Sequence, residues 1–223
     1  MERQGMRSAW GVLALGLALF VGASGPIVGQ SDGLSYVEDF GERKTWYSSA
    51  WDSGGFIQIA QDEENRTRCV VCPESADADT YAIDVAIIRD TGDRDRGQVT
   101  GLAGLEFRSA VGDEKKWSYA VLFDQDGRYV FFRLSPSRDV WEYLRHGETL
   151  DIRAGLSKVN HIEVEIGELN CYVRFNGGGR IGINAMIPRG GRVGCTVFNL
   201  DGVTTANFDN LCFRTVETSS IGD

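Results

Sequence analysis

Two glutamates in one short segment are the first candidates for chemistry in this 223-residue chain. Glu163 and Glu165 alternate with aliphatic residues, so an extended strand would place both carboxyl groups on one face, about 7 Å apart. Retaining glycoside hydrolysis uses two carboxyl groups about 5 Å apart, one as nucleophile and one as acid. Solubility of an exposed strand face is the simpler role, and the chain has no Gly-x-Ser-x-Gly or His-Glu-x-x-His motif. We therefore favour a non-catalytic protein and keep a glycoside hydrolase as the alternative.

The segment Cys69-Val70-Val71-Cys72 has the spacing of a redox or zinc motif. A redox pair normally opens a helix in an α/β protein, whereas this pair lies in a β-rich pattern. Zinc would need a second pair of ligands, and the other cysteines are far apart in the chain. We interpret all of the cysteines as structural thiols or disulfides, and because five is odd, at least one stays outside any intramolecular disulfide. The three remaining cysteines are Cys171, Cys195 and Cys212.

The quartet Asp124-Gln125-Asp126-Gly127 begins like a calcium-binding loop of the EF-hand type. Such a loop needs an oxygen ligand at its fifth position and a bidentate Glu at its twelfth. This chain has Arg128 and Ser135 at those positions, so the calcium interpretation fails. The quartet instead separates two apolar runs, and Asp126-Gly127 is a strong signal for a β-hairpin turn.

The elements that position these residues are predicted to be strands. From residue 36 onward, short apolar or alternating runs are separated by Gly, Asn and Asp, and no long stretch has helical spacing. Asn176-Gly177 and Asp201-Gly202 repeat the turn signal, which predicts at least three antiparallel connections. The expected strands are 56–60, 69–72, 81–89, 104–108, 118–123, 128–134, 140–144, 161–166, 170–175, 180–183, 191–199 and 207–214.

The first 30 residues have the layout of a signal peptide followed by a short linker. Arg3 and Arg7 precede an apolar run, 9–21, which is shorter than the roughly 20 residues of a membrane-spanning helix. We predict a secreted protein, periplasmic or extracellular, with no membrane span in its mature form. Residues 31–217 would form one domain, and 218–223 a disordered tail. The formal charge of −9 argues against a nucleic-acid partner, because phosphate neutralisation requires Lys and Arg.

The order of the segments between residues 36 and 215 is informative. The segments are VEDF (37–40), YAIDVAI (81–87), GLEFRS (104–109), YAVLFDQDGRYVFFRL (119–134), WEYL (141–144), VNHIEVEI (159–166), YVRFNG (172–177), GRVGCTVF (191–198) and NFDNLCF (207–213). In this order they resemble the concanavalin A-like jelly rolls, in their laminin-G-like and 3-keto-disaccharide-hydrolase-domain branch. The resemblance implies an all-β, two-sheet antiparallel sandwich, with any sugar site on the concave sheet and its rim. Laminarinase-type relatives carry a Glu-x-Asp-x-x-Glu or Glu-x-Asp-x-Glu strand, which this chain does not contain.

Alternation within 104–108 gives the first half of a candidate ligand site. If Leu105 and Phe107 face the core, Glu106 and Arg108 face solvent. Charged side chains on an open sheet face supply the oriented hydrogen bonds that fix the hydroxyl groups of a sugar. We therefore expect Glu106 and Arg108 to bind ligand.

Aromatic residues in the next strands complete this candidate site. In 128–134 we expect Tyr129, Phe131 and Arg133 to point outward, and Trp141 and Tyr143 extend the aromatic platform. Aromatic rings offer apolar area to the C–H face of a pyranose. The alternative, that these rings only cover the sheet, stays open. The same alternation points Val130, Phe132 and Leu134 inward.

The two ends of the domain carry a candidate metal site. Asp39 and Asp209 lie in the first and last expected segments, and terminal strands of jelly rolls often run side by side. The two carboxylates would then share a structural calcium ion with backbone carbonyls, since calcium prefers oxygen ligands. The alternative is that both side chains cap turns. No other cofactor is expected.

Three functions follow from these observations. The leading prediction is a secreted, non-catalytic glycan-binding or adhesion-type module whose partner is a carbohydrate or a cell-surface glycan. The second is a glycoside hydrolase acting on 3-keto-disaccharides or related glycosides. The third is a structural interaction module of an exported assembly.

Overall fold

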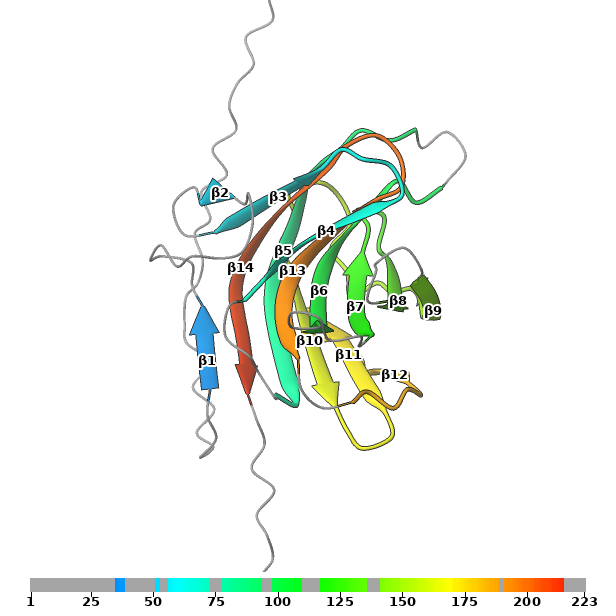
Figure 1. Ribbon diagram of the computed structural model, residues 1–223. Helices are drawn as coiled ribbons and strands as arrows, with labels where there is room; N and C mark the ends of the chain where they lie inside the picture. The colour runs from blue at the N-terminus through cyan, green and yellow to red at the C-terminus, as the bar shows by residue number, and fades with distance from the viewer. Residues whose placement is uncertain are drawn as a thin grey trace, which may run out of the picture. The chain divides into compact units, whose positions relative to one another are not determined.

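The computed structural model describes residues 35–38, 51–52, 56–72, 78–93, 98–109, 117–135, 141–188 and 191–214. In these ranges the chain forms antiparallel strands in two sheets and no helix, which confirms the predicted fold class (Figure 1). All twelve expected strands are present, and β1 (Ser35–Glu38) and β2 (Trp51–Asp52) were not predicted. The same ranges therefore offer no helix of membrane-spanning length. The predicted signal peptide, 1–30, and tail, 218–223, lie outside the described residues.

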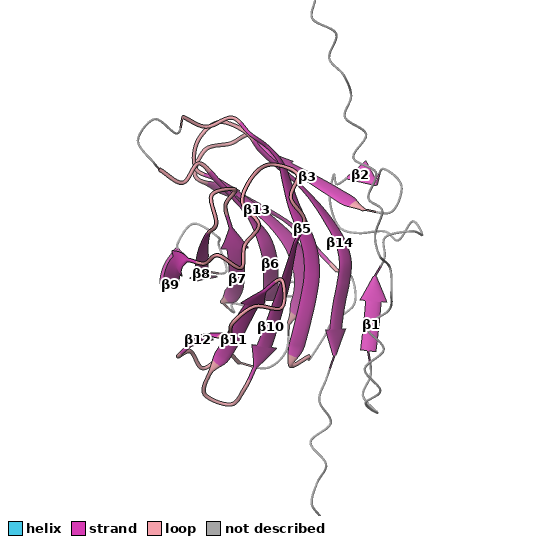
Figure 2. Ribbon diagram, turned by 180° about the vertical axis from the view of Figure 1, so that it is seen from behind, coloured by secondary structure: helices cyan, strands magenta, loops and turns pink. Residues whose placement is uncertain are grey.

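The larger sheet contains eight strands, and β1 pairs with β14 beside the main path. Neighbours in this sheet are often far apart in the sequence, since β5 lies between β10 and β14 (Figure 2). The order is β12 (Ile181–Ile183), β11 (Cys171–Phe175), β10 (Asn160–Ile166), β5 (Thr80–Asp90), β14 (Thr204–Arg214), β3 (Ile57–Gln61) and β2.

The smaller sheet contains six strands and packs against the first. Its central strands come from one continuous stretch of sequence, whereas β13 inserts between β4 and β6. The order is β4 (Arg66–Val71), β13 (Arg192–Asn199), β6 (Gly101–Ser109), β7 (Ser118–Phe123), β8 (Arg128–Leu134) and β9 (Trp141–Glu148).

The main core lies between the two sheets and follows the alternation of the strands. In β10, Ile162 and Val164 are fully buried, and Glu163 and Glu165 point to the outer face, as predicted. In β6, Leu105 and Phe107 are also in the core, which confirms that part of the prediction. Burying a side chain of this size stabilises the fold by about 1.5–3 kcal/mol relative to leaving it exposed.

The outward direction predicted for Tyr129 and Phe131 is wrong. Both rings lie in the core between the sheets, with 7% and 0% of their surface exposed. Val130, Phe132 and Leu134 instead face the outer side of the six-stranded sheet, where they form a second apolar cluster. Both faces of β8 are covered, so its alternation was correct but its orientation was reversed.

The β7–β8 connection is the predicted hairpin, although its turn is longer than two residues. Asp124 accepts hydrogen bonds from the backbone N–H groups of Asp126 and Arg128, both at 2.9 Å. Gly127 alone takes a positive φ, 91°, where a Cβ would be strained. Asp124 therefore acts as the side-chain acceptor that holds this turn.

The other two turn signals have different outcomes. Asn176 and Gly177 both have positive φ, 52° and 72°, and connect the paired strands β11 and β12. Gly202 also has positive φ, 75°, but the turn at Asp201-Gly202 joins β13 of one sheet to β14 of the other. The hairpin predicted at Asp201-Gly202 is therefore wrong, because the turn changes sheets.

Candidate functional site

The outer face of the six-stranded sheet is curled. The rings of Trp141 on β9 and Phe198 on β13 have centroids 5.2 Å apart, although three strands separate these two. Strands lie about 4.8 Å apart, so side chains on a flat sheet would not meet over that distance. Gly104 and Gly194 permit the curl, because a Cβ on either would lie 2.1 Å or 2.4 Å from a carbonyl oxygen of the neighbouring strand. This outer face is therefore the concave one.

An aromatic hollow of about 380 Å³ lies on this concave face. Its floor is apolar, and three exposed residues form a polar rim, two in the turn before β4 and one at the start of β4. In that turn Asn65 has a positive φ, 54°, which Asn tolerates better than most residues. The hollow is lined by Glu64, Asn65, Arg66, Thr67, Phe132, Leu134, Trp141 and Phe198.

Trp141 and Tyr143, which were predicted to extend an aromatic platform, lie next to each other on the concave face. Their rings meet edge to face with centroids 4.7 Å apart, and Tyr143 is 51% exposed. Trp141 is half-buried against Phe132 and Phe198. Since Trp141 lines the hollow and Tyr143 extends from it to solvent, the pair presents ring surface that a ligand can reach.

Glu106 lies on the same concave face but is fully buried. The hydroxyl group of Thr196 donates a hydrogen bond to its carboxylate at 3.0 Å. The predicted solvent exposure of Glu106 is therefore wrong. The other two positions of β6 on this face are Leu102 and Gly104, so the strand supplies one carboxyl group and not the pair of a retaining hydrolase.

The remaining predicted ligand residues do not join this hollow. Arg108 is 2% exposed, and its guanidinium group donates to the carbonyl oxygen of Ala78 at 2.9 Å, so the prediction that it faces solvent is wrong. Tyr129 packs on Phe175 in the core, with ring centroids 5.9 Å apart. Arg133 is partly exposed and donates two hydrogen bonds to Glu142, at 2.8 Å and 2.5 Å.

Arg133 also has an aromatic partner. Its guanidinium group lies 4.6 Å from the ring centroid of Trp117, a cation–π contact. Its hydrogen bonds to Glu142 raise its pKa above the ordinary value. Arg133 is thus held between a carboxylate and a ring, and it does not line the hollow.

The predicted calcium site is only partly within the described residues. Asp39 lies outside them. Asp209 is half-buried in the middle of β14, beside a bulge, where its carboxylate accepts a hydrogen bond from the backbone N–H of Asn210 at 2.7 Å. Within the described ranges no three His, Cys, Asp or Glu side chains are grouped to hold a metal ion. The shared calcium ion stays a prediction.

The cysteines fit the structural interpretation. All five lie within the described residues and none forms a disulfide. The Cys69–Cys72 segment belongs to strand β4 and its end, which is not the helix start that a redox pair uses. Burial raises the pKa of Cys171 to about 12 and that of Cys195 well above its usual value, so burial disfavours the thiolate form of both.

The polar groups on the other sheet form a separate chain of contacts. His161 Nδ1 lies 2.7 Å from Asp84, whose other oxygen accepts a hydrogen bond from Asn210 at 2.8 Å. This contact raises the pKa of His161 more than burial lowers it. Burial disfavours the Asp84 carboxylate, but the hydrogen bonds from His161 and Asn210 outweigh this effect and lower its pKa.

Comparisons with known proteins bear on the fold. No protein-family model and no curated protein sequence matches the chain. Solved structures do match. The carbohydrate-binding module CBM66 from Bacillus subtilis is 18% identical, with 80% of this chain and 94% of the module aligned at a TM-score of 0.55. The chain has a concanavalin A-like jelly-roll fold.

Two glucanases have the same jelly-roll fold. A β-glucanase from Bacillus licheniformis aligns with 84% of this chain and all of its own length, at 9% identity and a TM-score of 0.58. A prokaryotic β-1,3-1,4-glucanase derived from a mouse hindgut metagenome aligns at 9% identity and a TM-score of 0.61, covering 82% of this chain and 99% of the glucanase. The predicted jelly roll is thus confirmed, whereas the laminin-G-like branch is not.

Several residues of the hollow were missed from the sequence. Phe132 was expected in the core, and neither Phe198 nor residues 64–67 were predicted to bind ligand. Phe198 comes from a strand distant in sequence from β8 and β9, so no local pattern joins it to Trp141. A purely polar turn before β4 was the one available signal, since loops at sheet ends commonly carry binding residues.

Proposed function

We propose that this chain is a non-catalytic glycan-binding module that uses the aromatic hollow of its concave sheet. The observation that carries the proposal is the solvent-accessible pair Trp141 and Tyr143, set beside an apolar floor and a polar rim. Sugars bind such sites because their C–H faces pack on rings and their hydroxyl groups exchange hydrogen bonds with the rim. A volume of about 380 Å³ lies within the range of small-ligand sites.

The fold supports this proposal, and an exported location would suit it. The solved jelly rolls of similar fold include a carbohydrate-binding module and glucanases, and glycans are abundant outside the cell. We therefore keep the proposal that the chain is exported, on the signal-like layout of residues 1–30. The partner would be a carbohydrate or a cell-surface glycan.

Binding experiments with two ring variants test the proposal. Titration calorimetry of the full chain against soluble β-1,3-1,4-glucan, and a glycan array for other sugars, should show weak saturable binding. Trp141→Ala and Tyr143→Ala should each weaken it at least tenfold. Leu150→Ala, which removes a fully exposed side chain outside the hollow, is the matched control and should bind like the wild type. Binding that survives both ring substitutions would reject the hollow as the site.

A glycoside hydrolase acting on 3-keto-disaccharides or related glycosides is the second candidate. One observation favours it, the buried Glu106 carboxyl on the same concave face. A single carboxyl group from β6 is weaker support than the carboxyl pair of a retaining enzyme. Product release from a panel of 3-keto and β-linked disaccharides, abolished by Glu106→Gln, would establish catalysis. No release from any of these glycosides would support the binding function.

A further inference from the structure

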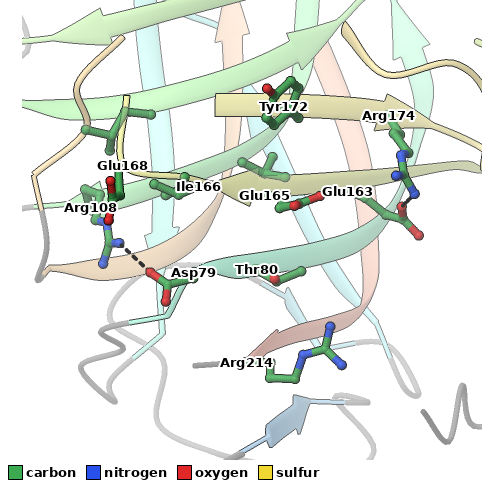
Figure 3. Close-up of a pocket in the computed structure, with 13 residues that line it drawn as sticks. Asp79, Thr80, Arg108, Glu163, Glu165, Ile166, Glu168, Tyr172, Arg174 and Arg214 are labelled. Carbon is green, nitrogen blue, oxygen red and sulfur yellow. Dashed lines mark ion pairs between the residues drawn. The ribbon is translucent and has the colours of Figure 1, made fainter. Parts of the chain in front are cut away.

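A polar groove of about 900 Å³ lies on the larger sheet, away from the residues of the aromatic hollow. It runs over the outer face of β10 and β11 and reaches the ends of β5 and β14. Figure 3 shows its side chains, with Tyr172 and Arg174 from β11, Glu163 and Glu165 from β10, and Arg214 from β14.

The register of the strands explains why the surface is hollowed at this point. Tyr172, Glu165, Thr80 and Arg214 stand in one row across four adjacent strands. Thr80 has the shortest side chain of the row and lies between longer ones on both sides (Figure 3). The row therefore has a low centre on β5 and raised walls on β10, β11 and β14.

Several charged side chains along the groove are held in pairs of opposite charge. Arg174 lies 3.7 Å from Glu163, and Arg108 lies 4.0 Å from Asp79, as Figure 3 marks. Glu165 pairs with Arg180, which also covers the ring of Tyr172 at 4.9 Å from its centroid. Pairing cancels most of the net charge but leaves carboxylate oxygens and guanidinium N–H groups along the wall. A surface of this kind suits hydroxyl groups, which donate and accept, better than a polyanion or a polycation.

Arg108 gives the groove a fixed end. Its backbone has a positive φ, 58°, beside a bulge in the β6–β13 pairing. Gly191 makes this possible, because a Cβ there would lie 2.7 Å from the Arg108 backbone. The guanidinium group is held by the Ala78 carbonyl and lies 5.8 Å from the Tyr81 ring centroid. Arg108 is buried, so it fixes the shape of this end of the groove from below.

We propose that this groove is a second glycan site, for a neutral hydroxyl-rich chain, so that one molecule of this protein bridges two glycans. The inference rests on the proposed glycan-binding function and adds a site on the other sheet. Tyr172, Glu165 and Arg174 are its contacts in this proposal, and they lie outside the aromatic hollow.

Stoichiometry and cross-linking test the two sites separately. The full chain is titrated with a soluble β-1,3-1,4-glucan oligosaccharide by calorimetry, and its ability to agglutinate glucan-coated beads is measured. The variants are Trp141→Ala for the hollow, Tyr172→Ala and Glu165→Gln for the groove, and Glu148→Gln as a control on an exposed residue outside both. Circular dichroism and thermal unfolding check that each variant is folded.

The expected result is two sites per chain in the wild type and one in the Trp141 variant or in either groove variant. Agglutination should be lost in all three and kept in Glu148→Gln. If the wild type has a single site, which Trp141→Ala removes and neither groove variant changes, the second site is rejected. The proposed function at the hollow then still holds. One site lost only in the groove variants would instead reject the hollow. Absence of binding to the glucan and to every array sugar would reject both.

Discussion

Alanine substitution of two tyrosines tests whether β8 places Tyr129 in the core while β9 leaves Tyr143 open to ligand. Tyr129 is 7% exposed and packs on Phe175 of the opposite sheet, so Tyr129→Ala leaves a cavity between the sheets. Large aromatic truncations in cores cost about 3–5 kcal/mol in free energy of unfolding. Tyr143 is 51% exposed, and its ring makes edge contacts with Trp141 at 4.7 Å and with His146 at 6.3 Å between centroids. An aromatic edge contact is worth about 0.5–1.5 kcal/mol, which we take as the main contribution of Tyr143 to stability. The two variants should therefore differ by roughly 2–4 kcal/mol.

Urea unfolding followed by far-ultraviolet circular dichroism measures this difference. The urea midpoint should fall clearly for Tyr129→Ala and little for Tyr143→Ala, with the slope of the transition unchanged. In thermal unfolding, the larger loss corresponds to a fall in Tm of about 6–20 °C for a domain of this size. Equal stability losses, or a larger loss for Tyr143→Ala, would refute the assignment of β8 and β9 faces.

Three further predictions concern charge, turns and metal. The contact with Asp84 raises the pKa of His161 in the folded protein. The pair therefore stabilises the fold fully at pH values below the pKa of an unfolded histidine, near 6.5. This stabilisation is lost as the pH rises through the pKa of His161 in the folded protein. His161→Gln should therefore lower Tm more at pH 5.5 than at pH 8.5. Gly177→Ala should cost about 1 kcal/mol from its positive φ. Gly179→Ala, where an added Cβ would also meet nothing within 4 Å, should be nearly neutral. If the predicted calcium site exists, EDTA should lower Tm, and Asp209→Asn should abolish that response; no EDTA effect would reject it.

The sequence predicted the strands well because their alternation is local, but it did not orient β8. Tyr129 and Phe131 on one face and Phe132 and Leu134 on the other are all apolar, and both faces are buried in the structure. A period of two shows that neighbouring residues point to opposite sides, but not which side is the core. The sequence prediction that Trp141 and Tyr143 lie on an accessible face nevertheless agrees with the structure. Strand β9 is less covered than β8, so its aromatic residues stay within reach of solvent.

The predicted site failed where the backbone departs from regular geometry. Arg108 was expected to alternate with Phe107, but the bulge and its positive φ send it to the end of the groove instead. The Asp201-Gly202 turn was recognised, but a turn motif contains no information about which sheet the next strand joins. The curl that brings Phe198 to Trp141 is likewise a property of the whole sheet, so local patterns could not predict the hollow.

The most direct test of glycan binding at the hollow is the indole signal of Trp141. In nitrogen-15 spectra of the full chain, the side-chain N–H resonance of Trp141, assigned with Trp141→Phe, is followed during titration with the β-1,3-1,4-glucan oligosaccharide. We predict a saturable shift of this resonance, together with shifts of the Tyr143 and Thr67 backbone amides beside the hollow. Saturable binding measured by calorimetry with no change at any of these three resonances would contradict the proposed site.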